Sequence, residues 1–281
     1  MNVSDFKFVA QLIQERSGLM LRADKAYLME SRLNPVMRRH GFKGFDELVA
    51  ALRDVQEGDL VKDVVEAMAT NETSFFRDRQ PFDQFRLVVL PHLLAHREAS
   101  KTIRIWCAGC SAGQEPYSLA IILKENQARL EAWNIEILAT DLSEPILEKA
   151  RQGLYSHFEI QRGLPISLLI KYFQKEEDRW RIDKAIRDMV RFERFNLLDA
   201  PTELGAFDVV LCRNVLIYFD QETKSAVLER IAGVTVDDGF LYLGSVETIL
   251  NLTEHFDLIP GHRGIYSPSN PADMLAVKTV G

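Results

Sequence analysis

The stretch Ile103-Arg104-Ile105-Trp106-Cys107-Ala108-Gly109-Cys110-Ser111-Ala112-Gly113-Gln114-Glu115 joins an apolar run to a turn that contains glycine. The run at 103–107 is typical of a buried strand, and helical spacing over about 114–130 predicts a helix after the turn. A strand, a glycine turn and a helix in this order can cradle a nucleotide cofactor at the carboxyl end of the strand. Gly109 and Gly113 would let the backbone approach such a ligand closely. The pattern is not G-x-G-x-x-G, which weakens a pyrophosphate-binding interpretation, and a tight turn with packing glycines is the plain alternative.

Short apolar runs alternate with helical segments downstream of this stretch. The spacing predicts strands at 135–140, 190–195, 207–212 and 240–244, and helices after Ser143 and over 221–232. Buried-type strands alternating with helices indicate an α/β fold with a mostly parallel sheet and right-handed crossovers. Residues from about 155 to 190 break this rhythm, and they predict an insertion that holds a small antiparallel hairpin.

The chain upstream of this stretch shows only helical spacing as far as about residue 70. It predicts a small all-helical domain at 1–70, in which four segments each carry an apolar face. At 70–78 the sequence becomes polar, then aromatic, then charged. We expect a linker over 71–90 that contributes to a cofactor site, followed by the α/β domain at 91–281 with its insertion at about 155–190.

Composition places limits on the function. The 281 residues include 47% hydrophobic and 27% charged residues and carry a formal net charge of −7, so the chain is globular and a general nucleic-acid binder is disfavoured. Three cysteines fit a reducing compartment, no apolar run approaches the ~20 residues of a membrane span, and the first residues do not resemble a signal peptide. We therefore expect a cytoplasmic protein without membrane insertion.

Asp141 follows the second predicted strand of the α/β domain. A carboxylate at this position can accept hydrogen bonds from both hydroxyls of a ribose, or it can cap the next helix, although Ser143 could serve as the cap instead. The pair Cys107 and Cys110 could be redox-active or half of a zinc site, but no second pair follows, and Cys212 is the only other thiol. No metal site is expected.

The segment 207–220 is a buried-type strand that ends in Arg213 and Asn214, with Tyr218 four residues later. Active sites in α/β sheets are built where strands end, and Arg and Asn are costly to bury there without partners. For Tyr218, an ordinary half-buried aromatic residue remains a serious alternative.

Taken together, these motifs resemble the chemotaxis protein methyltransferases (CheR-type), which transfer a methyl group from S-adenosylmethionine to glutamates of chemoreceptors. The patterns Asn-x-Thr-x-Phe-Phe-Arg and Cys-x-x-Gly-x-Glu-x-Tyr-Ser are highly specific when they occur together. The resemblance covers nearly the whole chain through the segments 70–78, 106–120, 139–142, 196–199, 207–220 and Gly244-Ser245-Val246-Glu247-Thr248. It implies a Rossmann-like methyltransferase domain with a small N-terminal all-helical domain and an inserted antiparallel β-subdomain.

The resemblance also implies roles for individual residues around the cofactor. Beyond Gly109 of the turn, Glu115 would bind the amino-acid end of the cofactor and Asp141 its ribose. Asn196 and Leu197 would flank the adenine. The residues that would contact the cofactor or complete its pocket are Asn71, Thr73, Arg77, Arg213 and Asn214.

The implied reaction moves a methyl group from a sulfonium onto a glutamate oxygen. A glutamate side chain has a pKa near 4.3, so it is already a carboxylate at neutral pH and needs no general base. Positioning and removal of water then supply the catalysis, and Arg77 and Tyr218 are the predicted catalytic residues that orient the incoming carboxylate.

The substrate surface is acidic, like this chain, so their encounter requires a local basic patch. Arg32, Arg38, Arg39 and Lys43 are the predicted patch, and the resemblance implies that their helical domain faces the methylation helices of the receptor; a solvated helix face is the alternative. In some relatives the β-subdomain binds a peptide at the receptor's C-terminus, and a glycine-rich hairpin loop marks those members. Here the corresponding residues 174–180 are acidic and lack glycine, which predicts independence from such a tether.

Two other functions remain open. A nicotinamide-dependent dehydrogenase is disfavoured by the absent G-x-G-x-x-G pattern. A non-catalytic adaptor could hold S-adenosylmethionine as a structural ligand or sensor, and binding without turnover would indicate it. Nothing in the sequence demands more than a monomer.

Overall fold

The computed structural model describes residues 2–55 and 57–269, and the chain divides into two units. Unit 1 comprises Met1–Thr70 and Tyr218–Lys224, and unit 2 comprises Asn71–Ile217 and Ser225–Gly281. The last residues of the expected α/β domain, 270–281, lie outside the described part of the chain.

Unit 1 is helical, as the apolar spacing predicts. Its helices are α1 (Val3–Ser17), a short 3₁₀ turn η1 (Ala23–Lys25), α2 (Ala26–His40), α3 (Phe45–Asp54) and α4 (Asp59–Met68). α2 packs against α3 and α4, and α1 packs against the same two helices. Their inward faces bury residues at helical spacing, among them Val9, Ile13, Leu33 and Val64, so burial of one face of each helix forms the core of this unit.

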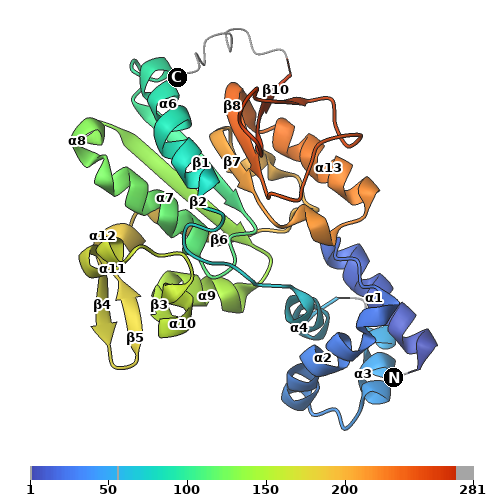
Figure 1. Cartoon of the computed structure of the whole chain (residues 1–281). Coiled ribbons are helices and arrows are strands. Elements are labelled where there is room, and N and C mark those ends of the chain that lie inside the picture. The colour runs from blue at the N-terminus through green and yellow to red at the C-terminus, as the bar shows by residue number, and fades with distance from the viewer. Residues whose placement is uncertain (1, 56, 270–281) are drawn as a thin grey trace. The chain divides into compact units, whose positions relative to one another are not determined.

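Unit 2 is built on a seven-stranded sheet in the order β6-β2-β1-β7-β8-β10-β9 (Figure 1). Its strands are β1 (Thr102–Ala108), β2 (Asn134–Asp141), β6 (Val190–Arg194), β7 (Phe207–Cys212), β8 (Thr235–Leu243), β9 (Phe256–Leu258) and β10 (Ile265–Pro268). The pairs β2–β6, β1–β2, β1–β7 and β7–β8 are parallel, whereas β10 pairs antiparallel with β8 and β9. The predicted α/β fold with a mostly parallel sheet is confirmed.

Helices flank this sheet. They are α5 (Gln80–Gln84), a π-helical turn η2 (Phe85–Val89), α6 (Leu90–His96), α7 (Gln114–Glu125), α8 (Gln127–Leu130), α9 (Glu144–Gln152) and α13 (Gln221–Ala232), of which Gln221–Lys224 belong to unit 1. α7 and α9 both pack against β2 and β6. Short 3₁₀ turns η3 (Pro201–Leu204) and η4 (Leu216–Tyr218) flank β7.

The insertion forms a separate three-stranded antiparallel sheet in the order β3-β5-β4 (Figure 1). Its elements are β3 (Leu154–Ser156), α10 (His157–Gln161), α11 (Ile166–Tyr172), β4 (Phe173–Glu176), β5 (Arg179–Ile182) and α12 (Lys184–Arg187). The predicted antiparallel subdomain is therefore present, and β3 adds a strand to the expected hairpin.

Several elements differ from the sequence-based expectation. The segment 80–96 is continuously helical, although 71–90 was expected to be a linker. Pro91 obscures this helix in the sequence because proline lacks an N–H, and the π-helical turn η2 ends two residues before Pro91. β8 begins at Thr235 rather than at 240, since Asp238 is accommodated in the strand by an ion pair with Arg97. The short strands β9 and β10 were not predicted.

Candidate active site

The turn between β1 and α7 has the conformation that its glycines allow. Gly109, Ser111 and Gly113 have φ values of +77°, +52° and +86°. The N–H groups of Gly109 and Cys110 donate to the Thr140 carbonyl at 2.8 and 2.9 Å, which joins the turn to the end of β2. A Cβ atom on Gly109 would lie 2.5 Å from Cγ2 of Val215. Glycine is therefore required at 109 both for its φ and for space.

Asp141 lies at the carboxyl end of β2 and is buried. Its Oδ2 accepts the N–H of Ser111 at 2.8 Å, and its Oδ1 accepts the N–H of Ser143 at 3.0 Å. Burial raises the pKa of Asp141, and the hydrogen bonds from Ser143 and Ser111 partly offset this rise. Each oxygen keeps capacity for another donor. Asp141 thus fixes the turn and the start of α9 while it can still accept a hydroxyl.

A buried ion-pair network links β7 to α7 and to the loop before α5. Nη1 of Arg213 lies 2.5 Å from Oε2 of Glu115, and Nη2 lies 2.8 Å from Oδ2 of Asp78. The side chain of Arg213 is 1% exposed and that of Glu115 is 12% exposed. Burial raises the pKa of Glu115, although the charge and hydrogen bond of Arg213 counteract it. Nε of Arg213 is buried and makes no hydrogen bond among the described residues.

Glu247 organises the segment after β7, although the sequence analysis assigns this residue no individual role. Its carboxylate accepts three backbone N–H groups, from Gly244 at 2.6 Å, Asn214 at 2.7 Å and Ile217 at 3.2 Å. Asn214 has φ of +60°, a conformation that costs free energy outside glycine. The signal in the sequence was a glycine at a strand end with a glutamate three residues later.

The loop that carries Asn71, Thr73 and Arg77 lies against the β1–α7 turn and α7. Oγ of Ser111 donates to the Asn71 carbonyl at 2.9 Å, and the N–H of Phe76 donates to Oγ of Ser118 at 2.9 Å. Nη1 of Arg77 donates to the Glu72 carbonyl at 2.9 Å, and Thr73 is half-buried.

The end of this loop is strained. Phe76, Asp78 and Arg79 have φ values of +50°, +68° and +50°, and none of them is glycine. Residues held in such conformations concentrate at functional sites. The strained loop and the Arg213 network meet at Asp78, which pairs with Arg213.

Asn196 and Leu197 lie just beyond β6, the strand next to β2, and Phe195 separates them from its end. Both are half-buried, and Oδ1 of Asn196 accepts the N–H of Leu198 at 3.1 Å. The structure thus places the predicted donor-binding residues of unit 2 at the carboxyl ends of β6, β2, β1 and β7 and in the loop before α5.

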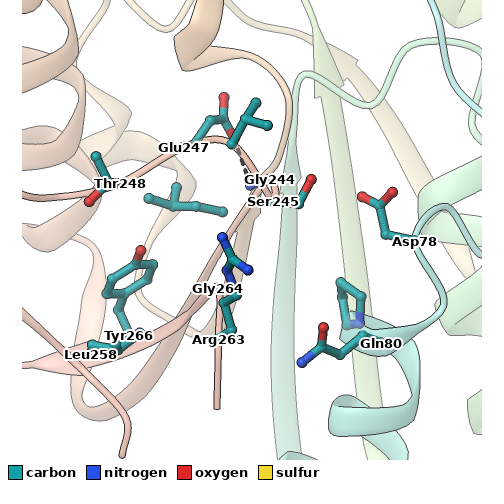
Figure 2. Close-up of a pocket in the computed structure, with 13 residues that line it drawn as sticks. Asp78, Gln80, Gly244, Ser245, Glu247, Thr248, Leu258, Arg263, Gly264 and Tyr266 are labelled. Carbon is teal, nitrogen blue, oxygen red and sulfur yellow. Dashed lines mark hydrogen bonds between the residues drawn. The ribbon is translucent and has the colours of Figure 1, made fainter. Parts of the chain in front are cut away.

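A cavity of about 430 Å³ opens in unit 2 beside Asp78 and Glu247 (Figure 2). We call it the hairpin pocket, because β9, β10 and the turn between them form one wall. It is lined by Asp78, Gln80, Pro81, Leu243, Gly244, Ser245, Val246, Glu247, Thr248, Leu258, Arg263, Gly264 and Tyr266. Sequence reasoning did not find it, since the strands that build it are short.

Tyr218 belongs to the segment Tyr218–Lys224 of unit 1. The N–H of Met20 donates to the Tyr218 carbonyl at 2.8 Å, and Nε2 of Gln14 donates to Oδ2 of Asp220 at 2.7 Å. Tyr218 therefore follows the Glu247-bound segment in the chain but packs with the N-terminal helices, and its catalytic role stays a prediction.

The predicted basic patch lies in unit 1, and its members differ. Nη1 of Arg32 donates to the Met68 carbonyl at 2.7 Å, so its guanidinium is engaged at the end of α4. Arg39 pairs with Asp63 at 3.0 Å but keeps 62% of its side chain exposed. Arg38 and Lys43 are exposed. Arg38, Arg39 and Lys43 are the members available to a partner.

All three cysteines belong to unit 2. Cys107, Cys110 and Cys212 are free and buried, and burial raises the pKa of each thiol. Within residues 2–55 and 57–269 there is no group of three or more His, Cys, Asp or Glu side chains that could hold a metal. No helix in these ranges is long and apolar enough to cross a membrane.

Comparisons with known proteins agree with this division of the chain. Residues 71–265 match the family model described as CheR methyltransferase, SAM binding domain, and residues 4–69 match CheR methyltransferase, all-alpha domain. The chain is 42% identical over 267 residues to chemotaxis protein methyltransferase 1 of Pseudomonas aeruginosa, covering 93% of this chain and 96% of that protein. It is 39% identical over 266 residues to chemotaxis protein methyltransferase Cher2 of Pseudomonas putida, with the same coverage.

Proposed function

The chain belongs to the CheR methyltransferase family, and we propose that it methylates glutamate side chains of chemoreceptors with S-adenosylmethionine as donor. The observation that carries this proposal is the buried carboxylate of Asp141, held by the N–H groups of Ser111 and Ser143 beside a glycine turn. A β-strand end that presents an acidic acceptor next to a close-approach glycine suits a ribose and the backbone around it. The family model that matches residues 71–265 names the same family as the sequence motifs.

The described residues fit the donor. The backbone at Gly109 is open to a ligand because the residue has no Cβ atom, and a Cβ there would collide with Val215. Asp141 can accept a further hydrogen bond on each of its oxygens. Glu115 offers a carboxylate to an ammonium group, and Asn196 with Leu197 follows the neighbouring strand β6. When bound, S-adenosylmethionine supplies an electrophilic methyl group on its sulfonium.

Arg213 and Glu247 hold the protein side of the reaction in place. Arg213 fixes Glu115 and Asp78 relative to each other through one guanidinium. Glu247 holds the backbone at Asn214 and Ile217, directly before Tyr218. Because the acceptor glutamate is already ionised near neutral pH, these residues contribute by positioning and by excluding water rather than by moving a proton. Arg77 and Tyr218 are the residues proposed to orient the acceptor carboxylate.

The titration of S-adenosylhomocysteine into the protein, followed by calorimetry, tests the cofactor class. We expect micromolar or tighter binding, no binding of NAD, and loss of binding in Asp141→Ala. A folded protein that binds NAD and not S-adenosylhomocysteine would reopen the dehydrogenase interpretation. Binding without methyl transfer to a receptor fragment would favour the adaptor.

We further propose that the enzyme works without a receptor C-terminal tether. The β4–β5 hairpin closes through Glu177 and Asp178 alone, and Glu177 has φ of +54°. Arg181 pairs across the hairpin with Glu176 at 2.5 Å, so the turn is short, acidic and internally bonded. Receptor fragments with and without their C-terminal tail should give the same kcat/KM. Micromolar binding of the isolated tail peptide would contradict this proposal.

The proposed partners are the cytoplasmic methylation helices of receptors, and the proposed location is the cytoplasm. We also propose that the enzyme acts as a monomer, because nothing in the sequence demands a second subunit. Light scattering during turnover with a receptor fragment would detect a functional dimer.

A further inference from the structure

Three charged side chains line the hairpin pocket, and only some of them already have partners within the protein. The carboxylate of Asp78 pairs with Arg213, and that of Glu247 accepts three backbone N–H groups. Arg263 is exposed, and its guanidinium makes no hydrogen bond or ion pair within the described ranges. Figure 2 shows this side chain standing between Tyr266 on one wall and Gln80 on the other. Of the three charged side chains in the lining, Arg263 is therefore the one without a protein partner in the described ranges.

The rim of the pocket is apolar and unusually exposed. Val246 is 76% exposed and Leu258 is 52% exposed, while the ring of Tyr266 forms a buried wall. A cation beside exposed aliphatic side chains is complementary to a partner that presents both a carboxylate and apolar residues. An amphipathic helix presents these together at i, i+3 and i+4 spacing.

The pocket lies in the half of the sheet away from Asp141. Gly244 and Glu247 follow β8, and Gly264 precedes β10, whereas Asp141 ends β2 on the other side of β1. Asp78 and Glu247 connect the two halves through Arg213 and the Asn214 backbone. A ligand in the pocket would thus lie beside the network that holds Glu115, without occupying the turn at Gly109.

We propose that the hairpin pocket receives an acidic segment of the receptor helix next to the glutamate that is methylated, and that Arg263 binds a carboxylate of this segment. This inference rests on the proposed function. It assigns the surface that binds the receptor beside the glutamate that accepts the methyl group. The chain carries a net charge of −7, so an acidic substrate needs local cations where it docks. Arg263 supplies one within unit 2 itself.

The test is the steady-state methylation of a purified receptor cytoplasmic fragment by Arg263→Gln, at saturating S-adenosylmethionine. Arg86→Gln is the matched control, because Arg86 is an exposed arginine of unit 2 that is absent from the pocket lining. We expect KM for the fragment to rise roughly tenfold in Arg263→Gln, between the effect of an exposed and a buried ion pair. The value of kcat should stay within about twofold of that of the parent, because the lost contact holds the substrate equally well before and during the reaction. The control should match the parent.

Equal KM values for Arg263→Gln and Arg86→Gln would overturn the inference while leaving the proposed function intact. A weaker affinity for S-adenosylhomocysteine in Arg263→Gln would assign the pocket to the donor instead, and would also overturn it. If the parent protein itself fails to methylate the fragment, the proposed function fails first. The two failures are therefore distinguishable.

Charge reversal provides an independent readout. Arg263→Glu should raise KM further than Arg263→Gln, because a like charge now faces the receptor carboxylate. Fragments in which single acidic residues near the methylated glutamate are changed to Lys are then assayed with this variant. We expect one such fragment to recover most of the lost kcat/KM. Recovery by none of them would contradict a direct contact between Arg263 and a receptor carboxylate.

Discussion

Replacement of Arg213 by Met should strongly destabilise unit 2, because it leaves a buried carboxylate without its partner. The side chains of Arg213 and Glu115 are 1% and 12% exposed and lie 2.5 Å apart. Removal of one member of a buried ion pair costs about 3–5 kcal/mol. Asp78 is 40% exposed and can turn to water, so it adds little to this cost. At about 2–4 °C per kcal/mol for a domain of this size, we expect the melting temperature to fall by about 6–20 °C.

The loss should depend on pH in a defined direction. Burial raises the pKa of Glu115 above its ordinary value of 4.5, and Arg213 counteracts this. Without Arg213 the folded-state pKa rises further. Between the ordinary and the folded pKa the folded state holds more protons than the unfolded state, so stability falls as pH rises through this interval. The difference in melting temperature between Arg213→Met and the parent should be smaller near pH 5 than near pH 8.

Differential scanning calorimetry at several pH values measures both effects. The double variant Arg213→Met/Glu115→Gln should recover part of the lost stability and lose most of the added pH dependence, because position 115 then carries no carboxylate. Arg191→Met is the matched control, since Arg191 is 53% exposed in its pair with Glu136 and should melt within about 2 °C of the parent. An Arg213→Met protein that melts like this control at every pH would refute the argument.

Three further predictions concern the site and the substrate surface. Glu247→Gln turns an amide N–H₂ toward backbone donors, so kcat should fall about 10–100-fold through displacement of the Asn214 segment; unchanged kcat in a methylation assay would count against a positioning role. Asp141→Asn replaces one acceptor oxygen by an N–H₂ donor that faces the N–H of Ser111 or Ser143. The Kd for S-adenosylhomocysteine, measured by calorimetry, should therefore rise at least about tenfold. An unaltered Kd would exclude Asp141 from the donor site. Arg38→Glu/Lys43→Glu should lower kcat/KM for a receptor fragment about tenfold at low salt and make it less sensitive to salt; a salt dependence identical to that of the parent would argue for a merely solvated helix face.

Most of the fold was predictable because periodicity and burial agree along much of the chain. Residues 207–212 are all buried in the structure, and apart from Asp208 they are apolar, as such a strand requires. β8 was only half predicted, since Asp237 and Asp238 resemble turn residues until Arg97 is seen to pair with the second of them. The strands β9 and β10 are three and four residues long, too short for alternation to distinguish them from a loop.

The candidate site was predictable where it depends on strand ends, and not where it depends on long-range pairing. Gly109 and Asp141 could be singled out because a glycine or a carboxylate after a buried strand points to the ligand-binding edge of such a sheet, and their roles toward a donor stay predictions. The partnership of Arg213 with Glu115 joins residues 98 positions apart, which no local pattern reveals. The sequence likewise placed Arg32 with the basic patch, although its contact with the Met68 carbonyl ties it to α4.

The most direct test of the central claim is the transfer of radiolabelled methyl groups from S-adenosylmethionine to a purified receptor cytoplasmic fragment, with Asp141→Asn assayed beside the parent. We predict label on the fragment that alkali releases as methanol, as expected of a glutamyl methyl ester, and little label with the variant. Tight binding of S-adenosylhomocysteine with no alkali-labile label on any receptor fragment would contradict the account and identify a protein that holds the cofactor without using it.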